Sequence, residues 1–128
     1  MHYIKPKNLM MKKTKEVSFN YRGKKFRIKT KNCNNFEKII GLMFKSRKKA
    51  EVLLFEFKEQ TQLKIHSFFV FFSFVAIWLD KKNKVVEIKK IKPFTVAVCP
   101  KKFYRRLIEI PINEKYAEKI KALGFPRR

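Results

Sequence analysis

The stretch HSFFVFFSFVAIWLD, residues 66–80, holds an almost unbroken apolar run from Phe68 to Leu79. A helix that crosses a bilayer needs about 20 consecutive apolar residues, so this run is too short to be a membrane span. Most of its residues are aromatic or β-branched, and these types favour packed strands over helices. The run therefore predicts one or two buried strands, with a bend near Ser73.

The length and composition indicate a single folded domain. The chain has 128 residues, of which 45% are apolar and 14 are Phe, enough for one hydrophobic core. The first fifteen residues, MHYIKPKNLMMKKTK, carry charge but lack the apolar segment of a signal peptide, so a soluble, cytoplasmic protein is expected. We expect residues 1–14 to form a flexible basic tail and residues 15–128 to form one β-rich domain.

The net charge is the strongest indication of a partner. Thirty-three Lys and Arg against ten Asp and Glu give a net charge of +23 and a pI near 10.3. Such an excess repels itself unless anions lie nearby, which favours a polyanion such as RNA, DNA or an anionic membrane surface. A general bias toward lysine is the alternative, although it accounts less well for the shortage of acids.

Alternating apolar residues predict further strands along the chain. The stretch EVSFNYRGKKFRIKT, residues 16–30, alternates on both sides of Arg22-Gly23-Lys24 and is typical of a β-hairpin. Strands are also expected in EVLLFEF (51–57), KVVEIKKI (84–91), FTVAV (94–98) and YRRLIEI (104–110). Polar loops are expected at KEQTQ (58–62) and DKKNK (80–84).

Two short helices complete the predicted fold. Asn34 with Glu37 resembles a helix cap, and apolar residues follow at helical spacing as far as Met43. Asn113 begins a second helix that closes at Gly124. The sequence thus predicts a mainly β, small sandwich or barrel-like domain with one or two short helices.

Several stretches, in this order, resemble the domain-of-unknown-function family 192. They are GLMFKS (41–46), VLLFEF (52–57), HSFFVFF…IWLD (66–80), KVVEIKKIKPFT (84–95) and CPKKFYRRLIEIP (99–111). The resemblance implies a small β-rich domain and no established activity. Two departures stand out: Ser73 and Val75 occupy places where family members usually have Pro and Asp, and the chain ends at ALGFPRR (122–128), where members often continue into a further turn and strand. The resemblance therefore implies a missing carboxylate and a shortened or open sheet edge.

Few side chains are candidates for chemistry. The catalytic candidates are three side chains. His66 could act as a general base or a ligand. Glu109 could act as a buried general acid, and Cys99 is a thiol beside cations. The structural alternatives are a hydrogen-bonded histidine, a carboxylate paired with Arg105 or another nearby cation, and a small buried thiol. Asp80 is the only Asp in the sequence, and its side chain is expected to stabilise the turn at residues 80–84.

The residues favour a binding protein over an enzyme. Two cysteines lack further ligands at zinc spacing, and three glycines do not make a phosphate loop, so no metal or cofactor is expected. The candidate contacts to nucleic acid lie in two basic clusters: Lys45, Arg47, Lys48 and Lys49, and Lys101, Lys102, Arg105 and Arg106.

Three hypotheses follow for function. The first is polyanion binding, to RNA or DNA, through the basic surface. The second is a small-molecule or hydrolytic site around His66 and Glu109, which requires both side chains in one concave pocket. The third is docking to an acidic protein through an open sheet edge.

Overall fold

The fold is a single sheet, seen in a computed structural model that describes residues 14–33, 41–43 and 45–125. In these residues the strands are β1 (Thr14–Tyr21), β2 (Lys24–Asn32), β3 (Leu53–Thr61), β4 (Phe74–Leu79), β5 (Val85–Ile91) and β6 (Tyr104–Pro111). The order across the sheet is β1-β2-β3-β6-β4-β5. Neighbouring strands are antiparallel, except that β2 and β3 are parallel. The prediction of a mainly β domain is confirmed.

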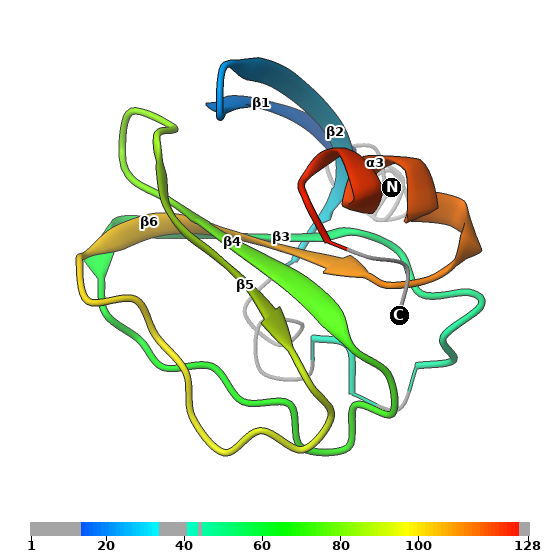
Figure 1. Ribbon diagram of the computed structural model, residues 1–128. Coiled ribbons are helices and arrows are strands. Elements are labelled where there is room, and N and C mark those ends of the chain that lie inside the picture. Colours follow the sequence, from blue (N-terminus) through cyan, green and yellow to red (C-terminus); the bar gives the residue numbers. More distant parts are fainter. Residues whose placement is uncertain (1–13, 34–40, 44, 126–128) are drawn as a thin grey trace, which may run out of the picture.

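The sheet curls into a half-barrel. β1 and β5 are its two edges in the strand order, yet side chains from both line one groove. Figure 1 shows the β1–β2 hairpin folding over the β4–β5 hairpin, with the C-terminal helix beside it. A flat sheet would hold its edges far apart, so the accumulated right-handed twist of six strands accounts for the curl.

Two apolar clusters lie on opposite faces of the sheet. One cluster lies inside the curl, under the C-terminal helix, and includes Val75, Ile77, Ile108 and Ile120. The other lies on the outer face and includes Phe55, Phe74, Trp78 and Leu107. Because successive side chains in a strand point to opposite faces, a central strand with apolar residues at every position serves both clusters. All six residues of β4 are buried for this reason.

The β1–β2 connection is a two-residue turn. Tyr21 pairs with Lys24, and the two residues between them, Arg22 and Gly23, have φ values of 50° and 78°. Two consecutive positive φ values are typical of the hairpin turn whose twist matches that of the strands. The predicted hairpin is confirmed, with Lys24 in the strand.

The β4–β5 turn depends on Asp80, as the sequence predicts. Its Oδ1 accepts hydrogen bonds from the backbone N–H groups of Lys82, at 2.8 Å, and Lys84, at 3.0 Å. Asn83 has a φ of 63°, the left-handed conformation that asparagine tolerates. This turn places Lys82 and Lys84 just before the start of the edge strand β5.

The predicted C-terminal helix is also confirmed. Asn113 Oδ1 accepts a hydrogen bond from the Tyr116 N–H at 3.3 Å, which caps a 3₁₀ turn (Glu114–Tyr116) that continues into α3 (Ala117–Ala122). Gly124 ends the helix with a φ of 97°. Residues 34–40 of the helix predicted after Asn34 lie outside the described residues, and residues 41–43, at its predicted end, form a turn. No helix in the described part of the chain is long and apolar enough to cross a membrane.

The run from Phe68 to Leu79 is only half strand. β4 begins at Phe74, whereas Phe68, Phe69 and Phe71 are exposed in the connection before it. The prediction that these three residues are buried was wrong. The reason is local: Phe69 has a φ of 60°, which breaks the extended backbone that a strand needs.

Two other predicted boundaries differ from the structure. Residues 58–61, expected in a polar loop, extend β3, because Thr61 still pairs with Tyr104 on β6 beyond a register shift. Residues 94–98, expected as a strand, form only one isolated bridge, between Ile65 and Val98. Phe94 at a φ of 59° follows a proline, and neither residue supports a ladder there.

Candidate functional site

A cavity of about 290 Å³ lies on the outer face of the sheet and contains Glu109. Its walls come from β3, β4 and β6 together with the segment before β3 and the connection after it. Most of the lining is apolar: Leu42, Phe55, Phe57, Leu63, Ile65, Val70, Phe74 and Leu107. Gly41, Lys64, His66 and Glu109 complete it. Such a lining, mainly aromatic and aliphatic with few polar groups, is typical of a small-molecule site.

Glu109 is a buried carboxyl that has no partner among the described residues. Its exposed fraction is 6%, and the residues opposite it on the neighbouring strands are Leu53 and Ala76. Among the residues that the structure describes, none donates a hydrogen bond to it or forms an ion pair with it. Burial therefore raises the pKa of Glu109 from 4.5 to about 8.

The alternative prediction, that Glu109 pairs with Arg105 or another nearby cation, is wrong for Arg105, and no other cation among the described residues pairs with Glu109. The Arg105 guanidinium Nε donates a hydrogen bond to the Phe57 carbonyl at 3.0 Å, and Arg105 is exposed. Alternation along β6 would place residues 105 and 109 on the same face of the sheet. The twist of the strand, and the register shift between β3 and the start of β6, give the two side chains different neighbours. The Arg105 guanidinium therefore does not neutralise Glu109.

Gly41 forms the wall beside the carboxyl. A Cβ atom at this position would lie 3.6 Å from Glu109 Oε1 and 3.6 Å from Phe55 Cζ, which is van der Waals contact. Gly41 has a φ of 53°, a conformation that glycine adopts without strain. A side chain here would occupy the space next to the acid.

His66 lies at the rim of the same cavity, where its side chain is exposed. Its Nδ1 accepts a hydrogen bond from the Phe68 N–H at 3.2 Å, and its ring centroid lies 5.0 Å from that of Phe68. This bond leaves Nε2 able to contact a bound molecule. The structure therefore brings His66 and Glu109 to one concave site, as the small-molecule hypothesis requires.

Tyr104 supports the rim from below. Its hydroxyl donates a hydrogen bond to the Leu63 carbonyl at 2.6 Å, and Leu63 lines the cavity. Burial raises the pKa of Tyr104, so the hydroxyl keeps its proton and remains a donor. Tyr104 is fully buried, whereas Phe103 beside it is exposed.

Cys99 does not join this site. It is half-buried, is a free thiol, and does not line the cavity. In the described residues, no group of three or more His, Cys, Asp or Glu side chains is arranged to hold a metal ion.

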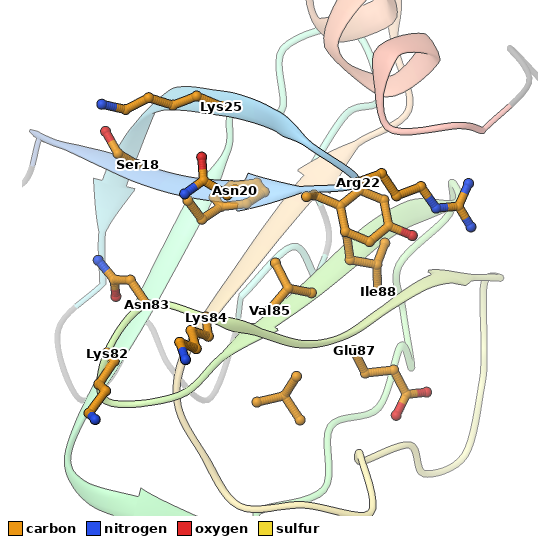
Figure 2. Close-up of a pocket in the computed structure, with 13 residues that line it drawn as sticks. Ser18, Asn20, Arg22, Lys25, Lys82, Asn83, Lys84, Val85, Glu87 and Ile88 are labelled. Atoms are coloured by element: carbon orange, nitrogen blue, oxygen red, sulfur yellow. The ribbon is translucent and has the colours of Figure 1, made fainter.

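A second concavity, the basic groove, runs between the two edge strands of the sheet. Its volume is about 700 Å³, and Figure 2 shows Val85 and Ile88 of β5 beneath β1. Four cations line it: Arg22, Lys25, Lys82 and Lys84. Glu87 is the one acidic residue in this lining. The guanidinium of Arg22 lies 5.2 Å from the ring centroid of Tyr21, a cation–π contact.

The two basic clusters expected from the sequence lie elsewhere. Lys45, Lys48, Lys49, Lys101 and Lys102 are exposed, and none of them lines the basic groove. Arg47 Nε donates a hydrogen bond to the Ile112 carbonyl at 3.0 Å. The sequence therefore did not identify the groove cations, although two of them flank a recognisable turn at Asp80.

Arg106 is held inside the sheet by Glu56. Arg106 Nε lies 2.8 Å from Glu56 Oε2, and the same oxygen lies 2.8 Å from Lys15 Nζ. Burial raises the pKa of Glu56, but hydrogen bonds from Lys15 and Arg106 lower this pKa by more, so that it lies below 4.5 overall. Arg106 also donates a hydrogen bond to Asn83 Oδ1. Its role is to join β6 to its neighbours.

Comparison with known proteins gives relatives without an assigned activity. UPF0127 protein PH1112 of Pyrococcus horikoshii is 32% identical over 91 residues, which cover 66% of this chain and 78% of that protein. UPF0127 protein PYRAB11210 of Pyrococcus abyssi is 28% identical over 93 residues, covering 72% and 79%.

Two solved structures share the fold. One is a proposed transcription regulator from Sinorhizobium meliloti, with a TM-score of 0.69 and 14% identity, covering 88% of this chain and 87% of that one. The other is a protein of unknown function from Novosphingobium aromaticivorans, with a TM-score of 0.68 and 14% identity, covering 88% and 80%.

The family model of DUF192, "Uncharacterized ACR, COG1430", matches residues 17–122, which include all of β2 to β6 and the capped C-terminal helix. The order of motifs, the half-barrel and this match agree, and the chain belongs to the DUF192 family, whose members have no established function.

Proposed function

We propose that the chain binds a small, mainly apolar molecule in the Glu109 cavity, with the Glu109 carboxyl as the recognition group. One observation carries this proposal: a carboxyl that is 6% exposed and lacks a hydrogen-bond partner among the described residues lines an apolar cavity. A buried polar group without a partner costs about 1–3 kcal/mol of stability, and a ligand that satisfies it recovers that free energy. A carboxyl whose pKa is raised by burial in a cavity is typical of a functional site.

The protonation of Glu109 indicates the chemistry of the ligand. With a pKa of about 8, the carboxyl is mostly neutral at pH 7 and offers one O–H donor and one acceptor. A ligand group with a matching acceptor and donor, such as a carboxamide, forms both hydrogen bonds. Phe55, Phe57 and Phe74 suit a flat apolar body. The volume, near the lower end of the usual range of about 300–1,000 Å³, selects a small molecule.

His66 supplies a second polar contact at the rim through its Nε2 atom. An acid that holds its proton at neutral pH can also donate it, so an acid-catalysed reaction of the bound molecule is the enzymatic form of this proposal. Binding is the step that both forms share. The test therefore addresses binding first.

The probe is benzamide, which combines an aromatic ring with a carboxamide. Titration followed by ¹H–¹⁵N NMR is expected to shift amide signals of the cavity, including those of Leu42 and Leu107. Binding should weaken about tenfold between pH 6 and pH 9, because Glu109 ionises in this interval. Glu109→Leu should abolish it, whereas Glu59→Leu, at an exposed position of β3, should not.

Gly41→Ala provides a steric test of the same site. The added methyl group would lie in contact with Glu109 Oε1 and fill the space that the carboxamide needs. Benzamide binding that is unchanged in both Gly41→Ala and Glu109→Leu would contradict the proposal. So would shifts confined to residues outside the cavity.

The basic groove supports a second candidate, polyanion binding. The specific observation is that one groove, beside an aromatic ring, is lined by four cations of the β1–β2 and β4–β5 hairpins: Arg22, Lys25, Lys82 and Lys84. A flexible single strand could lie along the groove, with phosphates beside the lysines and a base on Tyr21. Affinity for labelled single-stranded RNA should then fall by orders of magnitude between about 50 and 200 mM salt.

Two variants of equal charge separate the groove from the basic clusters. One replaces the four groove cations with Gln; the other replaces Lys48, Lys49, Lys101 and Lys102 with Gln. A larger loss in the first variant supports the groove, and a larger loss in the second returns the site to the clusters. Equal, small losses in both would contradict a localised nucleic-acid site. Capture of a partner that survives nuclease treatment would instead favour docking to an acidic protein.

A further inference from the structure

The exposed apolar side chains of this protein are gathered in two connections. Within the described residues, every exposed large hydrophobic side chain lies between β3 and β4 or between β5 and β6: Leu63, Phe68, Phe69, Phe71, Phe94, Val96 and Phe103. The rest of the described surface has none. In Figure 1 these two connections, green and yellow, run along the same side of the sheet. An apolar surface confined to one side indicates an interaction site.

The two connections are joined by backbone hydrogen bonds. Ile65 and Val98 exchange a pair of bonds, each 2.8 Å long. Ser67 is fully buried; its Oγ donates to the Lys92 carbonyl at 2.6 Å, and its carbonyl accepts from the Phe94 N–H at 2.9 Å. The connections therefore form one framework instead of two independent loops.

This framework holds three phenylalanine rings together at the surface. The ring centroid of Phe94 lies 6.4 Å from that of Phe69 and 5.5 Å from that of Phe71, both in edge-to-face contact. Phe69 and Phe94 have φ values of 60° and 59°, which are costly for bulky residues. The exposed fractions of the three rings range from 48% to 61%. We call Phe69, Phe71 and Phe94 the phenylalanine cluster.

The surroundings of the cluster are positive. Residues 62–73 and 92–103 contain four lysines, Lys64, Lys92, Lys101 and Lys102, all exposed, and no Asp or Glu. Apolar tips beside lysines match the headgroup region of an anionic bilayer, where rings enter the acyl boundary and ammonium groups contact phosphates. We propose that these two connections bind the chain reversibly to the surface of an anionic lipid membrane.

The chemistry of the patch favours lipid over nucleic acid. Bases stack on open ring faces, whereas Phe94 is already in edge contact with two other rings, and Leu63 and Val96 cannot stack. Acyl chains need only apolar contact area, which all seven side chains provide. Leu63 and Lys64 also line the Glu109 cavity, but the phenylalanine cluster does not, so the variants of the cluster test membrane binding separately from the cavity proposal.

Co-sedimentation with vesicles tests the proposal. The full chain is expected to sediment with vesicles of phosphatidylcholine and phosphatidylglycerol, to sediment much less with phosphatidylcholine alone, and to be released by high salt. The triple variant Phe69→Ser, Phe71→Ser, Phe94→Ser should lower partition about a hundredfold, because three half-exposed rings lose their apolar contact. Circular dichroism of the triple variant is the control for folding: its spectrum should match that of the native chain.

Two charge variants form a matched control. Replacing Lys64, Lys92 and Lys101 with Gln should weaken vesicle binding more than replacing Lys24, Arg27 and Lys29, three exposed cations on β2. The conservative variant Phe94→Trp should keep vesicle binding, and its emission should shift to shorter wavelength on anionic vesicles.

Three results would overturn the membrane proposal. The first is equal vesicle binding by the full chain and the triple serine variant. The second is Phe-dependent binding to single-stranded RNA without vesicle binding, which would make the cluster a base-stacking surface. The third is a dimer in solution that the triple serine variant abolishes, which would assign the surface to a second copy of the chain.

Discussion

Replacing Glu109 with Gln should remove the pH dependence of stability that this buried acid imposes. Glutamine keeps the shape of the side chain but does not ionise. In the unfolded chain the Glu109 carboxyl titrates near 4.5, and in the folded chain burial raises its pKa to about 8. Between these values the folded state holds a proton that the unfolded state has released, so the stability of the native protein falls as pH rises.

The magnitude follows from the interval between the two pKa values. At ~1.4 kcal/mol per pH unit, the interval from 4.5 to about 8 corresponds to about 5 kcal/mol of lost stability. This is an upper limit, since water that enters the cavity solvates the carboxylate. The stabilising contribution is complete below pH 4.5 and is lost by about pH 8. The free energy of unfolding of the Glu109→Gln variant, relative to that of the native protein, should therefore increase with pH throughout this range.

Urea unfolding of both proteins at intervals from about pH 4.5 to pH 9 measures the difference directly. Taking the difference cancels every group other than residue 109. Glu59→Gln, at an exposed position of β3, controls for the removal of one carboxylate. A difference between native protein and Glu109→Gln that stays constant across the range would refute the reasoning, because Glu109 would then ionise without cost in the folded state.

Three further changes test the framework around the sites. Glu56→Gln should lower stability at neutral pH by about 1–2 kcal/mol in urea unfolding; the loss should vanish as pH falls through the lowered pKa of Glu56, where the native carboxylate is protonated as well. Ser67→Ala should cost about 1–3 kcal/mol, because it removes the partner of the Lys92 carbonyl and of the Thr95 N–H, and should speed hydrogen exchange in both connections. Tyr104→Phe should cost about 1 kcal/mol and weaken benzamide binding, since the Leu63 carbonyl at the cavity rim loses its donor; unchanged stability in either variant would contradict the role assigned to its hydroxyl.

Much of the fold could be predicted because it depends on local patterns. Alternation with a central Gly23 placed the first hairpin, Asp80 placed the second turn, and Asn113 placed the C-terminal helix. These signals work because turn and cap geometry is determined within a few residues. The burial of β4 followed from its apolar length.

The candidate cavity could be predicted only in part. His66 and Glu109 were candidates because of their side-chain chemistry, and they are 43 positions apart in the sequence. That they line one cavity depends on the packing of the connection after β3 against β6, which is a tertiary contact. Gly41 gave no local signal, since its importance comes from the atoms that it approaches.

By itself, the sequence established a mainly β domain with a capped C-terminal helix, a large positive charge and a family resemblance, because composition and short-range patterns carry this information. Only the tertiary structure decided that Glu109 has no partner among the described residues, that cations of two hairpins line one groove, and that three phenylalanines expected in the core lie at the surface. Each depends on which distant segments meet, and that choice is made by strand order and sheet curvature.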